Sequence, residues 1–554
     1  MKRFFFTLLL AIAVGATTSA LACTNFIITK GASTDGSILV SYAADSHQLY
    51  GCLYKYNPLK KMPKMMPVTE WDTGKYMGDI PTVANTYATV GNMNEHSLII
   101  TETTFGGREE LYDPKGIMDY GSLIYITLQR AKTAREAIEI IVDLANTYGY
   151  ASSGESFSIA DTNEAWIMEL IGKGEDDKGI VWVARRIPDG YVCAHANQAR
   201  ITTFPLNDKE NCLYAPDVIT FARKKGYFSG KDEEFSFCDA YAPLDFGAMR
   251  GCEARVWAFF RSIADGMEQY EDFAMGYNKD NRMPLWVKPS KKISPKQVFD
   301  GMRDHYEDTK MDMTKDLGAG GHGLPYRWRP MSWKVDDKTY VNERAIATQQ
   351  TGFWVVGQAR PGKTGILWFG VDDAATSCLT PIYCNTTKAP ECMAEGNGSM
   401  LDYTPTSAFW LFNRVTNFAY MRYDMMSADI RKVVDKWENE MLKEVEKIDA
   451  KAAQMSAKAQ KKYLTEYSCA TAQTLFENWS RLDKYLLLKY MDGNLKSEHK
   501  DVLSYVFEKG QDNHTHFKDN GNGTQIPGDI QFPGYNEKWK RAVAADNGKI
   551  LESK

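Results

Sequence analysis

The sequence lacks several patterns that would place it in common functional classes. None of its ten cysteines is spaced as C-x₂-C, so a zinc ribbon is not predicted. The glycines around residue 320 are not followed by Gly-Lys-Ser or Gly-Lys-Thr, which argues against a phosphate-binding loop. No basic run is present and the formal net charge is −5, so nucleic acid is not an expected partner. We predict no cofactor and no metal site.

Long apolar runs are also missing beyond the first residues. No later stretch reaches the roughly 18 apolar residues of a membrane helix, so no transmembrane helix is expected in the mature chain. The chain has 554 residues, of which 44% are hydrophobic and 25% charged. That length and composition are typical of a globular protein with a large core.

Residues 1–22 have the pattern of a signal peptide. Lys2 and Arg3 precede an apolar run at residues 4–14, and Ala20-Leu21-Ala22 matches an A-x-A cleavage site. We therefore expect export to the periplasm or the extracellular space, with cleavage after Ala22. Cys23 would then be the first residue of the mature protein.

An N-terminal cysteine combines a nucleophile with a base. A thiol with a pKa of about 8.5 is only a few per cent thiolate at neutral pH. The α-amine titrates near pH 8, so it can take the thiol proton and later return it to a leaving amine. Two alternatives compete: an acylated lipoprotein cysteine, and an ordinary cysteine with cleavage elsewhere. The lipoprotein pattern has Leu three residues before the cysteine, where this chain has Ala20.

Two polar residues are candidate partners of Cys23. Residues 25–30 and 37–42 form a predicted hairpin around Asp35-Gly36, which returns Asp45 to the start of the first strand. Asp45 could orient the new α-amine, or could simply cap a turn. Asn197 follows a predicted strand and could donate its amide to an oxyanion, or could be a loop residue. His195 reads as a packed or surface histidine.

Further hairpins and a few helices complete the expected architecture. A helix is predicted at residues 131–148, where apolar residues recur with helical periodicity before Gly149. Antiparallel sheets layered with helices follow from this order. The predicted hairpins are 87–90 with 97–104, 157–160 with 165–171, 180–185 with 191–194, and 352–359 with 364–371; later helices are expected at 294–306, 430–453 and 457–490. The glycines of residues 318–323 predict a mobile loop.

An exported protein can form disulfides, and two cysteine clusters are candidate sources. One comprises Cys212, Cys238 and Cys252, and the other Cys378, Cys384 and Cys392. Their connectivity does not follow from the spacing.

Several motifs together resemble peptidase family C69. They are Cys23-Thr24-Asn25, Asp35-Gly36-Ser37, Asp45-Ser46, Asn94-Glu95, Ala194-His195-Ala196-Asn197 and residues 368–378. Family C69 comprises dipeptidases of the N-terminal-nucleophile (Ntn) hydrolase superfamily, similar to choloylglycine hydrolases. The resemblance covers about residues 23–490. It implies an α+β fold, the αββα sandwich of two antiparallel sheets between helix layers, and amide hydrolysis by an N-terminal cysteine.

The resemblance also implies roles for individual residues. Cys23 matches the nucleophile, Asp45 the acid that contacts its amine, and Asn197 the oxyanion-hole asparagine. A second oxyanion residue falls near Thr103 or Thr104, with Thr104 as the candidate, and a later arginine is matched to Arg344. One position departs from the pattern, because relatives commonly have arginine where this chain has Tyr42.

These features predict a cysteine dipeptidase that acts on small peptides. The expected organisation is a signal peptide at 1–22, a catalytic domain at 23–405, a helical extension at 406–495 and a loop-rich segment at 496–554. One alternative keeps the fold and hydrolyses a conjugated bile acid or another N-acyl amide. Another is a lipid-anchored protein that binds peptides without turnover. Whether the protein is a monomer or a homo-oligomer stays open.

The processing hypothesis predicts the mass of the exported protein. Intact mass spectrometry and N-terminal sequencing should find a chain that begins at unmodified Cys23, because cleavage after Ala22 frees its α-amine. A diacylglyceryl adduct on Cys23, or a different first residue, would contradict this prediction and favour the lipid-anchored alternative.

Overall fold

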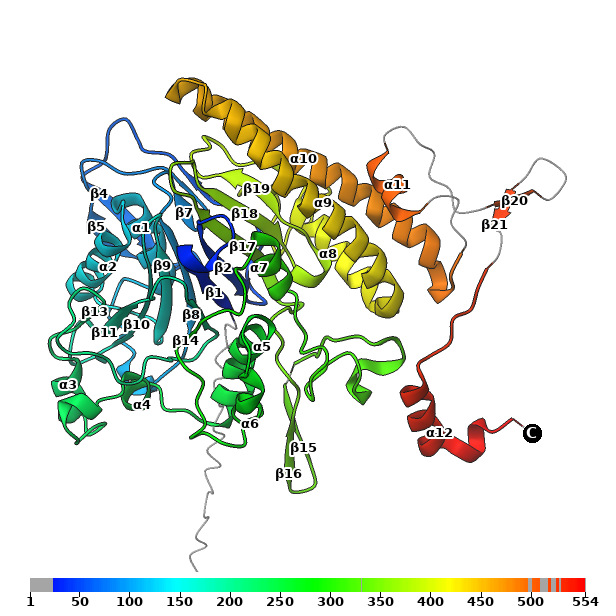
Figure 1. The fold of residues 1–554 in the computed structure, drawn as a ribbon, viewed down its shortest axis with the longest axis horizontal. Coiled ribbons are helices and arrows are strands. Elements are labelled where there is room, and N and C mark those ends of the chain that lie inside the picture. The colour runs from blue at the N-terminus through cyan, green and yellow to red at the C-terminus, as the bar shows by residue number, and fades with distance from the viewer. Residues whose placement is uncertain are drawn as a thin grey trace, which may run out of the picture.

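The computed structural model describes residues 23–329, 331–496, 501–508, 517–519, 525–527 and 530–553. Figure 1 shows the described chain as two sheets with helices on either side. The predicted signal peptide, residues 1–22, lies outside the described residues.

Two antiparallel sheets form the centre of the fold. The first has seven strands in the order β14-β12-β1-β2-β17-β18-β19. Its strands are β1 (Asn25–Ile28), β2 (Ile38–Asp45), β12 (Val192–His195), β14 (Trp286–Val287), β17 (Thr351–Ala359), β18 (Ile366–Val371) and β19 (Thr380–Tyr383). Every residue of β17 is buried, as expected of a strand covered on both faces.

The second sheet has eight strands in the order β13-β11-β10-β9-β8-β7-β6-β3. Its strands are β3 (Lys55–Tyr56), β6 (Thr89–Val90), β7 (Met93–Asn94), β8 (Ile99–Thr104), β9 (Glu155–Ala160), β10 (Ala165–Gly172), β11 (Ile180–Arg186) and β13 (Cys212–Tyr214). The two sheets pack face to face through β1, β2, β8 and β9. They approach closely at Gly357, where an added Cβ would lie 2.8 Å from Ile99 Cδ1.

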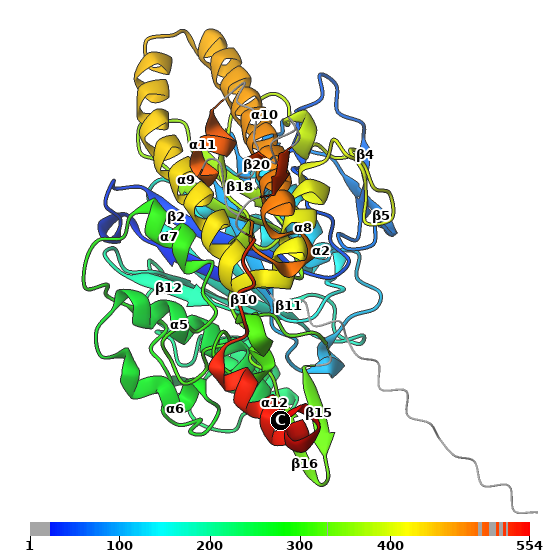
Figure 2. The ribbon, with the colours of Figure 1, turned by 90° about the vertical axis from the view of Figure 1, so that its right-hand side faces the viewer.

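Helices cover both outer faces. The helices α1 (Tyr120–Arg130) and α2 (Ala134–Tyr148) pack on the eight-stranded sheet. The seven-stranded sheet is covered by α5 (Ala254–Ile263), α7 (Pro295–Gly301), α8 (Ala408–Ala419), α9 (Tyr423–Ala452) and α10 (Ala457–Tyr490). Figure 2 shows α9 and α10 side by side. The four-layer αββα sandwich of an α+β protein is confirmed.

Smaller elements decorate this sandwich. They are the helices α3 (Val218–Lys224), α4 (Phe237–Tyr241), α6 (Glu271–Ala274), α11 (Val502–Phe507) and α12 (Glu537–Leu551), and the strand pairs β4 (Met65–Thr69) with β5 (Tyr76–Pro81), β15 (Ser332–Val335) with β16 (Lys338–Val341), and β20 (Phe517–Asp519) with β21 (Gln525–Pro527). No helix among the described ranges is both long and apolar enough to cross a bilayer.

Local sequence explains the boundaries of the predicted helix. Thr133 caps α2 by accepting a hydrogen bond from the Glu136 backbone N–H, and Gly149 ends it with a φ of 81°. The residues before Thr133 form a separate helix, α1, which begins at the capping box of Asp119 and Ser122. The sequence analysis missed α1.

Two predicted hairpins are wrong. Strands β11 and β12 do not form a hairpin, because β11 belongs to the eight-stranded sheet and β12 pairs with β1 in the other. The predicted 87–104 hairpin is a three-stranded meander, in which the short β7 pairs with both β6 and β8. The glycine-rich loop forms a kinked 3₁₀ segment, Leu317–His322, capped by Asp316. The predicted hairpins β1–β2, β9–β10 and β17–β18 are confirmed.

The expected disulfides are also absent. All ten cysteines are free thiols, and eight of them are buried. The members of the first cluster lie on separate elements: Cys212 on β13, Cys238 on α4, and Cys252 in the π-helical segment Ala248–Glu253 that leads into α5. Each packs locally as a small apolar side chain.

A buried ion pair fixes α9 to the sheet beneath it. Arg303 Nη2 lies 2.5 Å from Glu438 Oε1, and Nη1 lies 3.1 Å from Oε2. The Leu379 backbone N–H, just before β19, donates to the same carboxylate at 3.2 Å. Both side chains are at most 5% exposed. Their further ion pairs are longer: Arg303 Nη1 is 3.2 Å from Asp300 Oδ1, and Lys296 Nζ is 3.5 Å from Glu438 Oε2.

We therefore expect Glu438→Gln to lower the free energy of unfolding by about 3 kcal/mol, because it leaves the buried Arg303 guanidinium with only the partly exposed Asp300 carboxylate as counter-ion. Urea denaturation followed by circular dichroism measures this change. The matched control is Glu466→Gln, which breaks the exposed Lys462–Glu466 pair and should cost less than about 1 kcal/mol. Equal losses of unfolding free energy in the two variants would contradict a stabilising role of the buried Arg303–Glu438 pair.

Candidate active site

Cys23 lies two residues before β1, and its side chain points between the two sheets. The next residue, Thr24, bridges to Ala43, so the start of β1 lies beside the end of β2. The Cys23 side chain contacts both sheets: Sγ is 3.4 Å from Glu102 Oε1 on β8 and 4.0 Å from Tyr42 Oη on β2. Cys23 is 3% exposed. Burial raises the pKa of its thiol well above the usual value, and the Glu102 and Asp45 carboxylates raise it further.

Asp45 lies beside Cys23, where the predicted β1–β2 hairpin puts it. Its carboxylate is fully buried and held by two partners. Arg344 Nη2 lies 2.5 Å from Oδ2, and the Thr351 hydroxyl donates to Oδ1 at 2.6 Å. Burial raises the pKa of Asp45, and the Arg344 guanidinium offsets part of that rise. Arg344 therefore contacts the candidate acid directly.

Asn197 is joined to Cys23 through an arginine that the sequence analysis missed. Arg255 on α5 donates from Nη1 to the Cys23 backbone carbonyl at 2.6 Å and to Thr24 Oγ1 at 2.8 Å. Its Nη2 donates to the Ala196 carbonyl at 3.1 Å and to Asn197 Oδ1 at 3.0 Å. The one available signal was a charged residue within the apolar run of residues 254–260.

The amide and backbone of Asn197 are both constrained. Asn197 has a φ of 62°, a left-handed conformation that asparagine tolerates better than most residues. Its Nδ2 donates to the Thr104 carbonyl at 2.6 Å. A side-chain amide has two N–H donors, so one remains for another acceptor. Thr104 itself donates its hydroxyl to Glu155 Oε2 at 3.0 Å.

Glu102 and Glu155 form a buried acid pair, which the sequence analysis also missed. They lie on the neighbouring strands β8 and β9, are at most 1% exposed, and hydrogen-bond each other. Burial raises the pKa of both carboxyls, and Glu102 raises that of Glu155 further. Two carboxylates that meet in a buried site cannot both ionise, so the pair holds at least one proton. Tyr42 donates its hydroxyl to Glu102 Oε1 at 2.5 Å.

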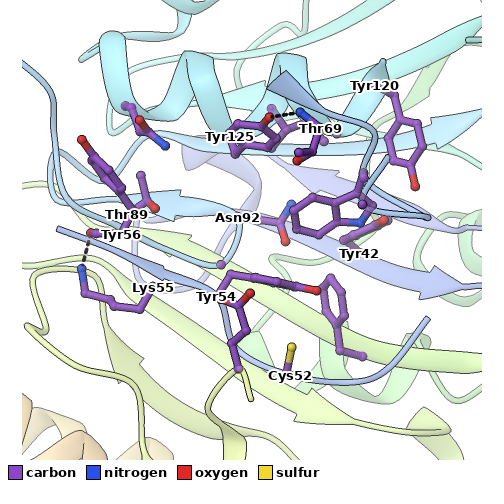
Figure 3. Close-up of a pocket in the computed structure, with 18 of the residues that line it drawn as sticks. Tyr42, Cys52, Tyr54, Lys55, Tyr56, Thr69, Thr89, Asn92, Tyr120 and Tyr125 are labelled. Carbon is purple, nitrogen blue, oxygen red and sulfur yellow. Dashed lines mark hydrogen bonds between the residues drawn. The ribbon is translucent and has the colours of Figure 1, made fainter. Parts of the chain in front are cut away.

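Two cavities adjoin this group. One, of about 480 Å³, has aromatic walls that include Tyr42, Tyr54, Trp71 and Tyr120 (Figure 3). The other is a cleft of about 960 Å³, lined by Thr104, Asn197 and several carboxylates. Tyr120 lines both cavities. Among the described residues, no cluster of three or more His, Cys, Asp or Glu side chains could hold a metal ion.

Comparison with known proteins identifies the family. The sequence profile of Peptidase family C69 matches residues 54–436. The chain belongs to peptidase family C69. A protein of Latilactobacillus sakei named "Probable dipeptidase" is 23% identical over 443 residues, which are 75% of this chain and 85% of that protein. A protein of Salmonella dublin with the same name is 24% identical over 339 residues, covering 56% of this chain and 72% of that protein.

A solved structure is also similar to this C69 chain. It is penicillin V acylase from Agrobacterium tumefaciens, with 12% sequence identity and a TM-score of 0.26; the match covers 65% of this chain and 86% of that one.

His195 lies beneath the site as a buried, neutral histidine. Its Nδ1 is 2.7 Å from Thr103 Oγ1, and its Nε2 is 2.7 Å from Ser158 Oγ. Burial, with a smaller contribution from Arg200, lowers the pKa of His195 to about 3. The interpretation of His195 as a packed residue is confirmed.

This shift predicts a pH dependence of stability. The pKa of His195 is about 3 in the folded protein and about 6.5 when unfolded, so between these values the unfolded state binds the extra proton. His195 should therefore lower the free energy of unfolding by about 1.4 kcal/mol for each pH unit below 6.5. Urea denaturation at pH 7 and pH 5 measures this, with His195→Gln as the comparison. An unchanged pH dependence in His195→Gln would contradict the assignment.

Proposed function

We propose that this C69 peptidase is an exported cysteine dipeptidase whose nucleophile, Cys23, becomes N-terminal when the signal peptide is removed. The observation that carries the proposal is the convergence on Cys23 of the Asp45–Arg344 pair and the Arg255–Asn197 pair. The name carried by the two curated relatives supports peptides of two residues as substrates. The segment from Lys2 to Ala22 supports export to the periplasm or the extracellular space.

The chemistry uses the two functional groups of one residue. Cys23 Sγ bonds to the carbonyl carbon of the scissile amide, its proton passes to the α-amine, and the carbonyl π electrons move to oxygen. The free N–H of Asn197 stabilises that oxyanion. Collapse breaks the C–N bond, and the proton returns to the leaving amine. Water then hydrolyses the thioester, which releases the N-terminal amino acid and restores the thiol.

The raised pKa of the Cys23 thiol explains why the mechanism needs the α-amine as a base. A thiol that is protonated at rest needs a proton acceptor at the moment of attack. Asp45 is positioned to hold that amine, while Arg344 and Thr351 fix its carboxylate.

The aromatic cavity supports a second candidate on the same fold. Walls formed by Tyr54, Trp71 and Tyr120 would suit the apolar acyl group of an N-acyl amide (Figure 3). A panel of dipeptides and N-acyl amides separates the two candidates by their relative kcat/KM.

Cys23→Ala, made with the native signal peptide, should be exported and folded but inactive. Loss of the nucleophile should lower kcat by at least about 10³-fold on any hydrolysed dipeptide. Release of free amino acids measures this. The control is Cys469→Ala on α10, outside the site, which should keep its activity. Turnover in Cys23→Ala would refute the mechanism.

The role of the α-amine has its own test. A chain that retains Ala22 ahead of Cys23 keeps the thiol but lacks the free amine on the same residue. It should lose dipeptide hydrolysis while its thiol still reacts with an alkylating reagent. Full activity in this chain would show that another group takes the thiol proton.

A further inference from the structure

Among the residues that the structure describes, the acid pair beside the proposed nucleophile has no cationic partner. Two other buried carboxylates are paired with arginine, Asp45 with Arg344 and Glu253 with Arg200 at 2.9 Å. A third, Asp119, accepts hydrogen bonds from the Trp71 and Ser122 backbone N–H groups. Within the described part of the chain, neither Glu102 nor Glu155 forms an ion pair with a lysine, arginine or histidine. Their partners are neutral donors, the hydroxyls of Tyr42 and Thr104 and the Cys23 thiol.

With one proton between them, Glu102 and Glu155 carry a single negative charge. A lone charge in a buried site is costly unless a counter-ion arrives. Glu102 Oε2 and Glu155 Oε1 accept no hydrogen bond from any other described residue. Tyr42 adds a hydrogen bond without neutralising the charge, whereas an arginine at this position would neutralise it.

The position of the charge indicates which cation would fit. Glu102 Oε1 is 3.4 Å from Cys23 Sγ, the atom that bonds to the substrate's carbonyl carbon. In a peptide with a free N-terminus, the ammonium group is attached to the carbon next to that carbonyl. The ammonium of the residue being cleaved off is therefore within reach of Glu102.

The adjoining cleft has the same sign of charge. Its walls carry six carboxylates and one arginine, Arg108: Glu70, Asp72, Glu109, Glu110, Asp119 and Asp245. Such a cleft raises the local concentration of cations relative to neutral or anionic molecules. An N-terminal ammonium would be attracted into this cleft, whose wall includes Thr104, the hydrogen-bond partner of Glu155.

We propose that Glu102, held by Glu155, binds the α-ammonium of the substrate's N-terminal residue, so that the site selects peptides with a free, charged N-terminus. This inference rests on the proposed function and specifies its substrate class. The rival cation is the α-amine of Cys23 itself, which would pair with Glu102 equally for every substrate.

The test compares two substrates in one enzyme. The first is an alanyl dipeptide, and the second is its propanoyl analogue, which differs only in lacking the amine. Wild-type kcat/KM should favour the alanyl dipeptide by about 30-fold or more, as expected for a charged hydrogen bond in a buried site. The preference should fall above about pH 8, where the substrate amine loses its proton. A wild-type preference below threefold would overturn the inference.

Two isosteric variants test which carboxylate binds the substrate's ammonium group. Glu102→Gln removes the carboxylate next to Sγ and should reduce the preference to less than about fivefold. Glu155→Gln leaves Glu102 to ionise alone and should retain the preference within about threefold of wild type. A ratio of two substrates cancels losses that both share, so a merely structural role would leave it unchanged in both variants. An unchanged ratio in Glu102→Gln would overturn the proposal, as would equal losses in both variants.

Failure of the inference is distinct from failure of the proposed function. Hydrolysis of both substrates at similar rates, abolished by Cys23→Ala, would keep the cysteine mechanism and reject amine recognition. Turnover that survives Cys23→Ala would reject the mechanism and this inference together.

Discussion

The geometry of the site depends on the hydrogen bonds of the Arg255 guanidinium. One buried side chain from α5 hydrogen-bonds to the Cys23 carbonyl, the Thr24 hydroxyl, the Ala196 carbonyl and the Asn197 amide oxygen. It thereby fixes the start of β1 against the end of β12, two strands that are antiparallel neighbours. Burial lowers the pKa of Arg255, and Arg344 lowers it further, so two cations lie close together beside the proposed nucleophile. A substitution of Arg255 would therefore change both the position of the Cys23 backbone and the positive charge beside its thiol.

The charges around Cys23 are arranged with opposite signs on two sides. Arg255 and Arg344 come from the side of the seven-stranded sheet, where Arg344 neutralises Asp45. The acid pair of Glu102 and Glu155 comes from the eight-stranded sheet and forms the acidic side of the site. The thiol lies between the two groups, so its protonation state depends on both sheets and on how closely they pack. A close approach such as that of Gly357 to Ile99 therefore matters to the chemistry as well as to the core.

Local patterns predicted the parts of this fold that are set by local interactions. The Asp35-Gly36 turn and the strands beside it predicted the β1–β2 hairpin, and with it the proximity of Asp45 to Cys23. Arg255, Glu102 and Glu155 were not predicted, because each reaches Cys23 from an element distant in sequence. The residues around Glu102 in the sequence do not indicate whether its side chain faces the other sheet or the solvent. The β11–β12 connection failed for the same reason, because a turn motif does not specify which sheet receives the next strand.

The acid pair of Glu102 and Glu155 would also affect how the product leaves the site. Hydrolysis turns the substrate's carbonyl into a carboxylate, next to the carboxyls of Glu102 and Asp45. If the incoming ammonium is attracted by the acid pair, the newly formed anion is repelled by it, and the amino acid leaves with charges of both signs. The same unpaired charge would then favour binding of the peptide and release of the product, without any movement of the backbone.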